Sequence, residues 1–202
     1  MSKLKFVLAS NNPGKLREMK DILSELGIDV LSQKEAGISS EPEETGTTFE
    51  ENAAIKARAA MELSGLPALA DDSGIVVDAL GGAPGVYSAR YGGCNTDEER
   101  MGLLLKNMEK EEHRDAKFVS CIAVAFPNGD VLITRGECAG KLTYEPRGEN
   151  GFGYDPIFFM ERFGKTLAEV SAEEKNSVSH RGRALRAMKE RLADYFKENG
   201  TC

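Results

Sequence analysis

The sequence predicts an α/β protein with a mixed β-sheet covered by helices. In the first half of the chain, short apolar runs alternate with stretches whose apolar residues recur every three or four positions, which is typical of strands alternating with helices. In the centre, two β-rich runs flank an Asn-Gly pair, which indicates an antiparallel hairpin. The 202 residues, 41% of them hydrophobic, suffice for one sizeable core. We therefore expect residues 1–202 to form a single domain.

The opening segment predicts a strand, a polar loop and a helix. Lys5–Ala9 is a short apolar run that stops at the turn-forming residues after it. The next apolar residues share one helical face: Leu16, Met19, Leu23 and Leu26. We expect this helix to end at Gly27, since glycine is favoured just past a helix end.

Capping patterns predict where the later helices begin. Four Ser or Thr residues are followed three positions later by Glu: Thr47–Glu50, Thr48–Glu51, Thr96–Glu99 and Ser171–Glu174. The first two predict a helix that runs to Leu63 and ends at Gly65. A final helix is expected to open at Ser179.

The remaining apolar runs predict strands. Leu66–Ala70 reads as a short buried strand that ends at Asp71, and Ile75–Val77 continues the apolar pattern after it. Phe118–Phe126 and Val131–Thr134 form the two arms of the expected hairpin. Because that hairpin is antiparallel, the sheet should be mixed.

Composition and charge exclude several classes of protein. A net charge of −7 argues against a general nucleic-acid binder, because phosphate backbones are held by an excess of Lys and Arg. A nucleotide substrate is still compatible, since a few local cations and a divalent metal suffice to hold a triphosphate. No stretch approaches the roughly 20 apolar residues that span a bilayer, and the first residues lack a signal-peptide pattern. We therefore expect a cytoplasmic protein with no membrane partner.

The first candidate site lies between the first strand and the first helix. It comprises Ser10, Asn11, Asn12, Pro13, Gly14 and Lys15. Backbone N–H groups at a helix start favour anions, and a lysine adds a mobile charge for phosphate oxygens. The Walker pattern is absent, since Leu16 follows Lys15. A routine turn with an asparagine cap is the alternative.

Carboxylates form the second candidate site. Asp71 and Asp72 leave a strand in different directions, so that one can bind a metal while the other orients a partner. Carboxylate oxygens are the ligands that Mg²⁺ prefers, and Glu43 or Glu44 could complete the site. The alternatives are an Asx turn at Asp71–Gly74 and a solvated acidic loop.

Two further segments carry candidate ligand-binding residues. Between Gly148 and Pro156, glycines flank Phe152, whose ring offers a stacking face for a base, and Asp155 offers an acceptor. From Glu173 to Arg183, donors gather at a helix start: Lys175, His180, Arg181 and Arg183. The alternatives are a turn that packs aromatic rings into the core and a purely structural histidine.

Taken in order, these segments resemble one family. Six motifs match the inosine/xanthosine triphosphate pyrophosphatase family in its bacterial form: residues 10–15, 43–53, 70–74, 80–91, 151–158 and 174–182. The resemblance implies an elongated α/β fold with a long mixed sheet, two lobes with a nucleotide cleft between them, and a homodimer. It also implies hydrolysis of ITP, dITP and XTP between the α and β phosphates, which yields a nucleoside monophosphate and pyrophosphate.

The same resemblance implies roles for individual residues. Asp72 matches the catalytic base and metal ligand, and Glu43 or Glu44, with a slight preference for Glu44, helps to hold Mg²⁺. Lys56 matches a further phosphate-facing lysine. The substrate-binding residues beyond Ser10–Lys15 are Ser73, Phe152, Gly153, Tyr154, Asp155, Lys175, His180 and Arg181.

These roles combine into a mechanistic hypothesis. Asp72 activates a water for in-line attack while Mg²⁺ bridges phosphate oxygens, with Lys15 and Lys56 stabilising the developing charge. Donors aimed at a purine 6-keto group would be left unpaired against adenine, which explains rejection of ATP. Three alternatives stay open: a hydrolase for other modified nucleoside triphosphates, a nucleotide sensor without turnover, and a nucleic-acid binder.

Overall fold

The computed structural model describes residues 5–25, 28–39 and 42–199. Its strands form one seven-stranded sheet in the order β2-β1-β3-β4-β5-β6-β7. The strands are β1 (Lys5–Leu8), β2 (Asp29–Ser32), β3 (Ala68–Val77), β4 (Asp115–Ala125), β5 (Val131–Leu142), β6 (Phe158–Met160) and β7 (Lys165–Thr166). β1 pairs in parallel with β2 and β3, whereas β6 pairs antiparallel with β5 and β7. The predicted α/β class with a mixed sheet is confirmed.

The helices include three that begin where the capping patterns place them. The helices are α1 (Pro13–Glu25), α2 (Phe49–Ser64), α3 (Asp97–Asn107), α4 (Ala172–Val178) and α5 (His180–Asn199), with short 3₁₀ helices η1 (Asp78–Leu80), η2 (Gly85–Gly93) and η3 (Asp155–Ile157). Thr48, Thr96 and Ser171 cap α2, α3 and α4, each with the expected glutamate. Gly65 ends α2 with a φ of 69°. The expected helix end at Gly27 lies outside the described residues.

The structure corrects the predicted strands in one important respect. Asp71–Gly74 is not a turn at the end of a strand, because β3 continues through it as extended backbone from Ala68 to Val77. The two aspartates are buried within this strand, which is possible because each has cationic partners. Strands β2, β6 and β7 have two to four residues, too few for a periodic pattern to reveal.

The chain divides into two compact units. Unit 1 comprises Met1–Asp72, Ser120–Gly136 and Arg181–Cys202, and unit 2 comprises Ser73–Val119 and Glu137–His180. β3, β4 and β5 therefore each contribute residues to both units.

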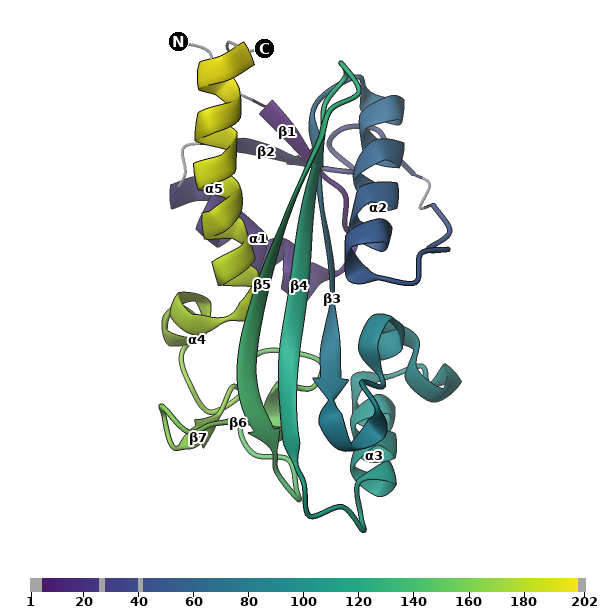
Figure 1. Ribbon diagram of the computed structural model, residues 1–202, viewed down its shortest axis with the longest axis vertical. Helices are drawn as coiled ribbons and strands as arrows, with labels where there is room; N and C mark the ends of the chain where they lie inside the picture. The colour runs from purple at the N-terminus through teal and green to yellow at the C-terminus, as the bar shows by residue number, and fades with distance from the viewer. Residues whose placement is uncertain (1–4, 26–27, 40–41, 200–202) are drawn as a thin grey trace. The chain divides into compact units, whose positions relative to one another are not determined.

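In unit 1, the two faces of the sheet carry different helices. One face packs against α1 and α5 through a cluster of large apolar side chains: Phe6, Leu8, Met19, Leu23, Leu69, Ile122, Val124, Phe126, Leu185, Met188 and Leu192. α2 contacts β1 and buries a row of alanines. Figure 1 shows α1 and α5 on one side of β1 and β2, and α2 on the other. Since side chains alternate along a strand, Leu69 and Asp71 share the α1/α5 face, while Ala70 and Asp72 face α2.

Unit 2 has its own apolar core. Its fully buried members come from β3, α3 and the residue that follows α3, β5, η3, β6 and the segment after β7: Ile75, Val77, Leu104, Met108, Cys138, Ile157, Phe158 and Leu167. Gly74 shows how closely β3 is packed here, because a Cβ atom at this position would lie 2.4 Å from the Gly85 carbonyl oxygen and from Ser88 Oγ. Only glycine fits at this position without displacing the backbone.

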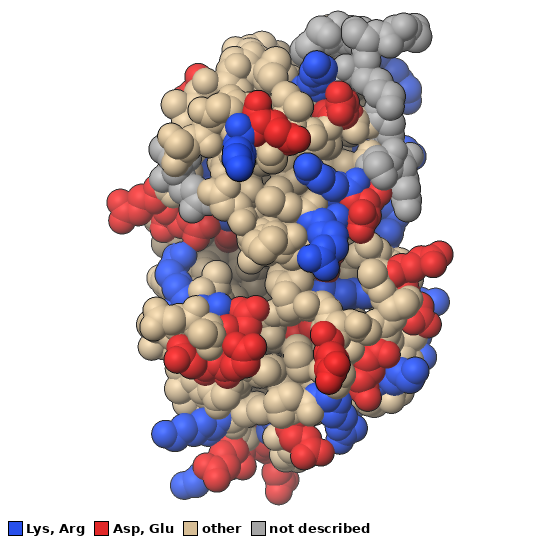
Figure 2. Space-filling model, turned by 180° about the vertical axis from the view of Figure 1, so that it is seen from behind, with Lys and Arg blue, Asp and Glu red and all other residues tan. Residues whose placement is uncertain are grey.

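Charged side chains of both signs are mixed on the molecular surface. Figure 2 shows Lys and Arg interspersed with Asp and Glu over much of the face in view. Phosphate recognition on such a surface requires a local cluster of cations. None of the described helices combines the length and the apolar character needed to cross a membrane.

Candidate active site

The carboxylate of Asp71 is the centre of a buried polar cluster in unit 1. Ser120 Oγ donates to its Oδ1 at 2.5 Å, and Lys15 Nζ lies 2.8 Å from its Oδ2. Arg181 Nη2 lies 3.4 Å from the same oxygen, while Nη1 of this arginine pairs with Glu18. Burial raises the pKa of Asp71, but Arg181 and Lys15 outweigh it and hold the pKa well below its usual range. Asp71 therefore stays ionised and fixes two cations.

Asp72 faces the opposite side of β3 and has a different environment. Its Oδ1 accepts a hydrogen bond from Lys56 Nζ at 2.7 Å, and the same ammonium donates to Glu44 Oε1 at 2.8 Å. Burial raises the pKa of Asp72 against the opposing effect of Lys56 and Lys15. Burial would lower the pKa of Lys56, but the carboxylates of Asp72 and Glu44 raise it overall. Lys56 is therefore a stable cation between two carboxylates.

The second oxygen of Asp72 is free to bind a ligand. Oδ2 is buried and has no hydrogen-bond partner within the part of the chain that the structure describes. A buried, unpaired carboxylate oxygen is costly unless a ligand or cation satisfies it. Within the same residues, no group of three His, Cys, Asp or Glu is placed to hold a metal. Mg²⁺ needs no such group, because it is usually bound by one or two carboxylates, waters and substrate phosphates.

The loop from Ser10 to Lys15 leads from β1 into α1. Asn12 Oδ1 accepts a hydrogen bond from the backbone N–H of Lys15 at 3.0 Å, and Ser10 Oγ accepts one from the N–H of Asn12 at 3.3 Å. Asn11, Asn12 and Pro13 are exposed, and Gly14 is partly buried. The asparagine thus caps the helix while the Lys15 side chain reaches Asp71. Glu43, the alternative metal ligand, has an exposed side chain, whereas Glu44 is partly buried beside Lys56.

In unit 2, the predicted base-binding residues form a second cluster around Asp155. Lys175 Nζ lies 2.6 Å from Asp155 Oδ2, which also accepts the backbone N–H of Phe152 at 2.9 Å. The same ammonium lies 4.7 Å from the centroid of the Phe152 ring. Tyr154 is buried and donates its hydroxyl to the Ser88 carbonyl at 2.8 Å. The partly buried Phe152 ring is thus held by a lysine that is itself fixed by Asp155.

Three predicted residues remain: His180, Ser73 and Arg181. His180 is buried and its ring stacks on Phe118, with centroids 4.8 Å apart and planes at 15°. Ser73 directly follows Asp72 in β3 and is partly buried. Arg181 lies in unit 1, where it is 1% exposed and paired with two carboxylates.

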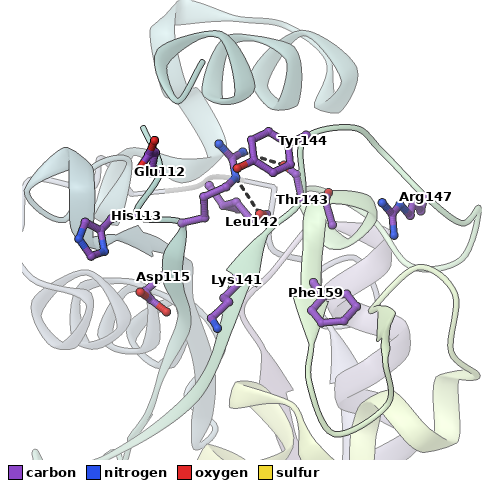
Figure 3. Close-up of a pocket in the computed structure, with 10 residues that line it drawn as sticks. Glu112, His113, Asp115, Lys141, Leu142, Thr143, Tyr144, Arg147 and Phe159 are labelled. Carbon is purple, nitrogen blue, oxygen red and sulfur yellow. Dashed lines mark hydrogen bonds between the residues drawn. The ribbon is translucent and has the colours of Figure 1, made fainter. Parts of the chain in front are cut away.

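A separate pocket in unit 2 contains none of the predicted residues. It has a volume of about 420 Å³ and is lined by Glu112, His113, Arg114, Asp115, Lys141, Leu142, Thr143, Tyr144, Arg147 and Phe159. Figure 3 shows His113 and Arg147 at opposite ends of this pocket. Lys141 pairs with Glu161, and Arg114 donates to the carbonyls of Leu142 and Thr143. These cations do not converge as phosphate binding requires.

Comparison with known proteins identifies the family of this chain. A family model described as the Ham1 family matches residues 6–191. The chain belongs to the Ham1 family. Two relatives named dITP/XTP pyrophosphatase come from Yersinia pseudotuberculosis and Haemophilus influenzae, and they are 50% and 52% identical to this chain. The alignments cover 94% of this chain and 98% and 100% of those proteins.

A solved structure supports the same relationship. The HAM1 protein from Coxiella burnetii is 47% identical to this chain and superposes with a TM-score of 0.86. The match covers 95% of this chain and 99% of that protein. The family assignment therefore applies to both units of this Ham1-family protein.

Three polar residues of these clusters were not predicted from the sequence. Glu18 pairs with Arg181, Ser120 donates to Asp71, and Asp97 accepts the backbone N–H of Gly153. For two of them, Glu18 and Ser120, the sequence contains a feature that could have indicated the role. Glu18 lies one helical turn after Lys15, and Ser120 is a hydroxyl residue within the apolar run 118–126. Asp97 left no comparable signal beyond its place in a helix start.

We expect Asp71→Asn and Asp72→Asn to change stability in opposite directions. The lowered pKa of Asp71 means that its stabilisation is present above the unfolded value of 3.8 and lost as pH falls through the folded value. At neutral pH, Asp71→Asn should cost about 3–5 kcal/mol, because it leaves buried cations unpaired. The pKa of Asp72 is raised, so the pH dependence is reversed. The stabilisation that the protonated Asp72 contributes is present below the unfolded value of 3.8 and is lost as pH rises through the folded value. Asp72→Asn should therefore raise the melting temperature at neutral pH.

Thermal melts of the metal-free variants at neutral and acidic pH test this contrast. The gain from Asp72→Asn should shrink on acidification, because wild-type Asp72 then also becomes neutral. The two substitutions are isosteric and adjacent in the chain, so each serves as the control for the other. Equal destabilisation by both variants at neutral pH would contradict the assignment.

Proposed function

We propose that this Ham1-family chain hydrolyses the purine nucleoside triphosphates dITP, ITP and XTP to the nucleoside monophosphate and pyrophosphate. The observation that carries the proposal is sequence identity. The chain is identical at about half of the aligned positions, over nearly its full length, to proteins named dITP/XTP pyrophosphatase. The two polar clusters supply groups suited to this reaction. Removing such nucleotides keeps them out of nucleic acids.

Unit 1 supplies the phosphate-handling groups. Lys15 and Lys56 are partly exposed cations, with side chains 17% and 15% exposed, held on opposite faces of β3 by Asp71 and Asp72. A lysine ammonium has three N–H donors, and the carboxylate partners described above use one or two of them. Each ammonium therefore has at least one N–H that can donate to a phosphate oxygen. Because their carboxylate partners fix them before substrate binds, little reorganisation is needed as negative charge develops on the leaving pyrophosphate.

We propose that Asp72 and Glu44 hold the Mg²⁺ ion of this reaction. The unpaired Oδ2 of Asp72 and the partly buried Glu44 offer the hard oxygen donors that this ion prefers. When bound, Mg²⁺ neutralises charge on the phosphate oxygens. The exposed Glu43 is the weaker of the two candidate ligands.

Asp72 also has the properties of a general base. In the metal-free protein, burial raises the pKa of Asp72, which makes its ionised carboxylate a stronger proton acceptor. Water attacks the α phosphorus in line, the bond from that phosphorus to the bridging oxygen breaks, and pyrophosphate leaves. The proton of the attacking water passes to the Asp72 carboxylate. Lys56, bonded to Oδ1, keeps that carboxylate oriented.

Unit 2 supplies the groups for the purine base. The Phe152 ring is held beside the Lys175 ammonium, and we assign this ring the role of stacking on the base. His180 is fixed by its stacking on Phe118, and we assign it the role of donor to the 6-keto group. We assign the same role to Arg181 of unit 1, as the family resemblance implies. Adenine carries an amino group at this position, which would leave the donors unpaired. We further propose a homodimer, as the family resemblance implies, and a cytoplasmic location, as expected from the sequence.

A substrate panel tests the reaction. With Mg²⁺, we expect dITP, ITP and XTP to release pyrophosphate, and ATP to react at least about 100-fold more slowly because its 6-amino group leaves donors unpaired. Pyrophosphate and orthophosphate are assayed separately. Release of orthophosphate alone would refute α–β cleavage. Faster turnover of modified pyrimidine triphosphates would indicate another hydrolase, and binding without turnover would indicate a sensor.

The metal ligands are tested by two matched variants, Glu44→Gln and Glu43→Gln. Each removes one negative charge from neighbouring positions of the same segment. We expect Glu44→Gln to raise the Mg²⁺ concentration for half-maximal activity by about 10–100-fold, because such losses are typical when a group supporting a metal site is removed. Glu43→Gln should leave that concentration unchanged. The opposite result would assign the ligand to Glu43.

A further inference from the structure

Asp97, in the first turn of α3, contacts the glycine-rich loop that carries Phe152. Its Oδ2 accepts the backbone N–H of Gly153 at 2.9 Å. Its Oδ1 pairs with Arg100 Nη2 at 2.6 Å, and Nη1 of the same arginine donates to the Cys94 carbonyl at 2.9 Å. Each carboxylate oxygen thus has one partner, and the arginine fixes the direction in which Oδ2 points.

The conformation of the loop explains why this contact matters. Gly151 and Gly153 have φ angles of 76° and 62°, in the left-handed region that glycine adopts without strain. Glycines on both sides of Phe152 leave the backbone with many alternative conformations when it is unrestrained. Within the loop, the N–H of Phe152 is held by Asp155. For Gly153, the partner is Asp97, which lies more than 50 positions earlier in the sequence.

Asp97 is not needed to cap its own helix. Thr96 accepts the backbone N–H of Glu99, and the Glu99 side chain returns to the backbone N–H of Thr96. The capping box is therefore complete without Asp97. The Asp97 side chain is 44% exposed, so it is not a core residue either. Its distinctive structural contribution is the link to the loop.

We propose that Asp97 is a positioning residue for purine recognition: it fixes the Gly153 backbone and thereby the orientation of the Phe152 ring and of Asp155. This inference rests on the proposed function of the loop. Asp97 does not touch the reacting phosphates, which the proposal assigns to unit 1. Its loss should therefore weaken nucleotide binding and leave the chemical step almost unchanged.

Steady-state kinetics with dITP and three variants test the proposal. Asp97→Ala should raise KM about tenfold, which is typical for loss of a hydrogen bond to a charged group, with kcat within about twofold of wild type. Asp97→Asn keeps an oxygen acceptor for Gly153 and should restore most of the affinity. Glu98→Ala removes an exposed acidic side chain from the same helical turn and should match wild type.

Calorimetric binding of a non-hydrolysable dITP analogue should show the same order of affinities. An unchanged KM and binding constant in Asp97→Ala, with active wild-type enzyme, would overturn the positioning role and leave the proposed function intact. Equal effects of Asp97→Ala and Glu98→Ala would also overturn it. Wild-type protein that neither binds the analogue nor hydrolyses dITP would refute the proposed function itself, and the positioning role with it.

Hydrogen exchange supplies a test that needs neither turnover nor a variant. The Gly153 amide should exchange slowly in the wild-type protein, because its N–H is held by the carboxylate. Exchange at the rate of an unprotected amide would contradict the proposal even if Asp97→Ala cannot be produced in folded form.

Discussion

The buried carboxylate of Asp71 is the interaction on which the arrangement of unit 1 depends. It joins a hydroxyl of β4, a lysine of α1 and an arginine of α5, elements far apart in the sequence. A buried charge is tolerated only when its partners are in place. Arg181 also pairs with Glu18, so the two cations of the cluster, Lys15 and Arg181, face two carboxylates. The cluster therefore fixes how α1 and α5 meet the sheet, and with it the position of Lys15.

The alternation of side chains along β3 separates two tasks between adjacent aspartates. Asp71 faces the helices α1 and α5, where cations saturate it and lower its pKa. Asp72 faces α2, where a single lysine occupies one oxygen and the other has no partner among the described residues. Asp71 thus stabilises the packing of unit 1, whereas Asp72 keeps one carboxylate oxygen available for a ligand. The same carboxylate chemistry gives different roles because the strand turns each side chain to a different environment.

Local sequence signals predicted the helices well. The capping boxes begin α2, α3 and α4 because the hydrogen bonds that define them are formed within four consecutive residues. The Asn-Gly pair lies in the tight turn that joins β4 to β5, where the N–H of Phe126 donates to the Asp130 carbonyl. The paired aspartates were recognised as a candidate site from their chemistry, but their surroundings were not.

What the sequence did not reveal depends on partners distant in the chain. Asp71–Gly74 resembles a turn by composition, and it is a strand because Lys15, Lys56 and Arg181 neutralise its carboxylates from three different helices. The short strands β2, β6 and β7 are defined by their neighbours in the sheet rather than by any pattern of their own. Asp97 likewise acquires a role only through Gly153. Such contacts can be identified only when the fold is known, because the partners are far apart in the sequence.

The division between the two aspartates is tested most directly by their own titration. Aspartate-selective ¹³C labelling, with Asp71→Asn and Asp72→Asn used to assign the signals, follows each carboxyl carbon by NMR as the folded, metal-free protein is acidified. Asp72 should take up its proton above the ordinary value of 3.8, and Asp71 should remain ionised well below it. The reverse order of titration would contradict the account.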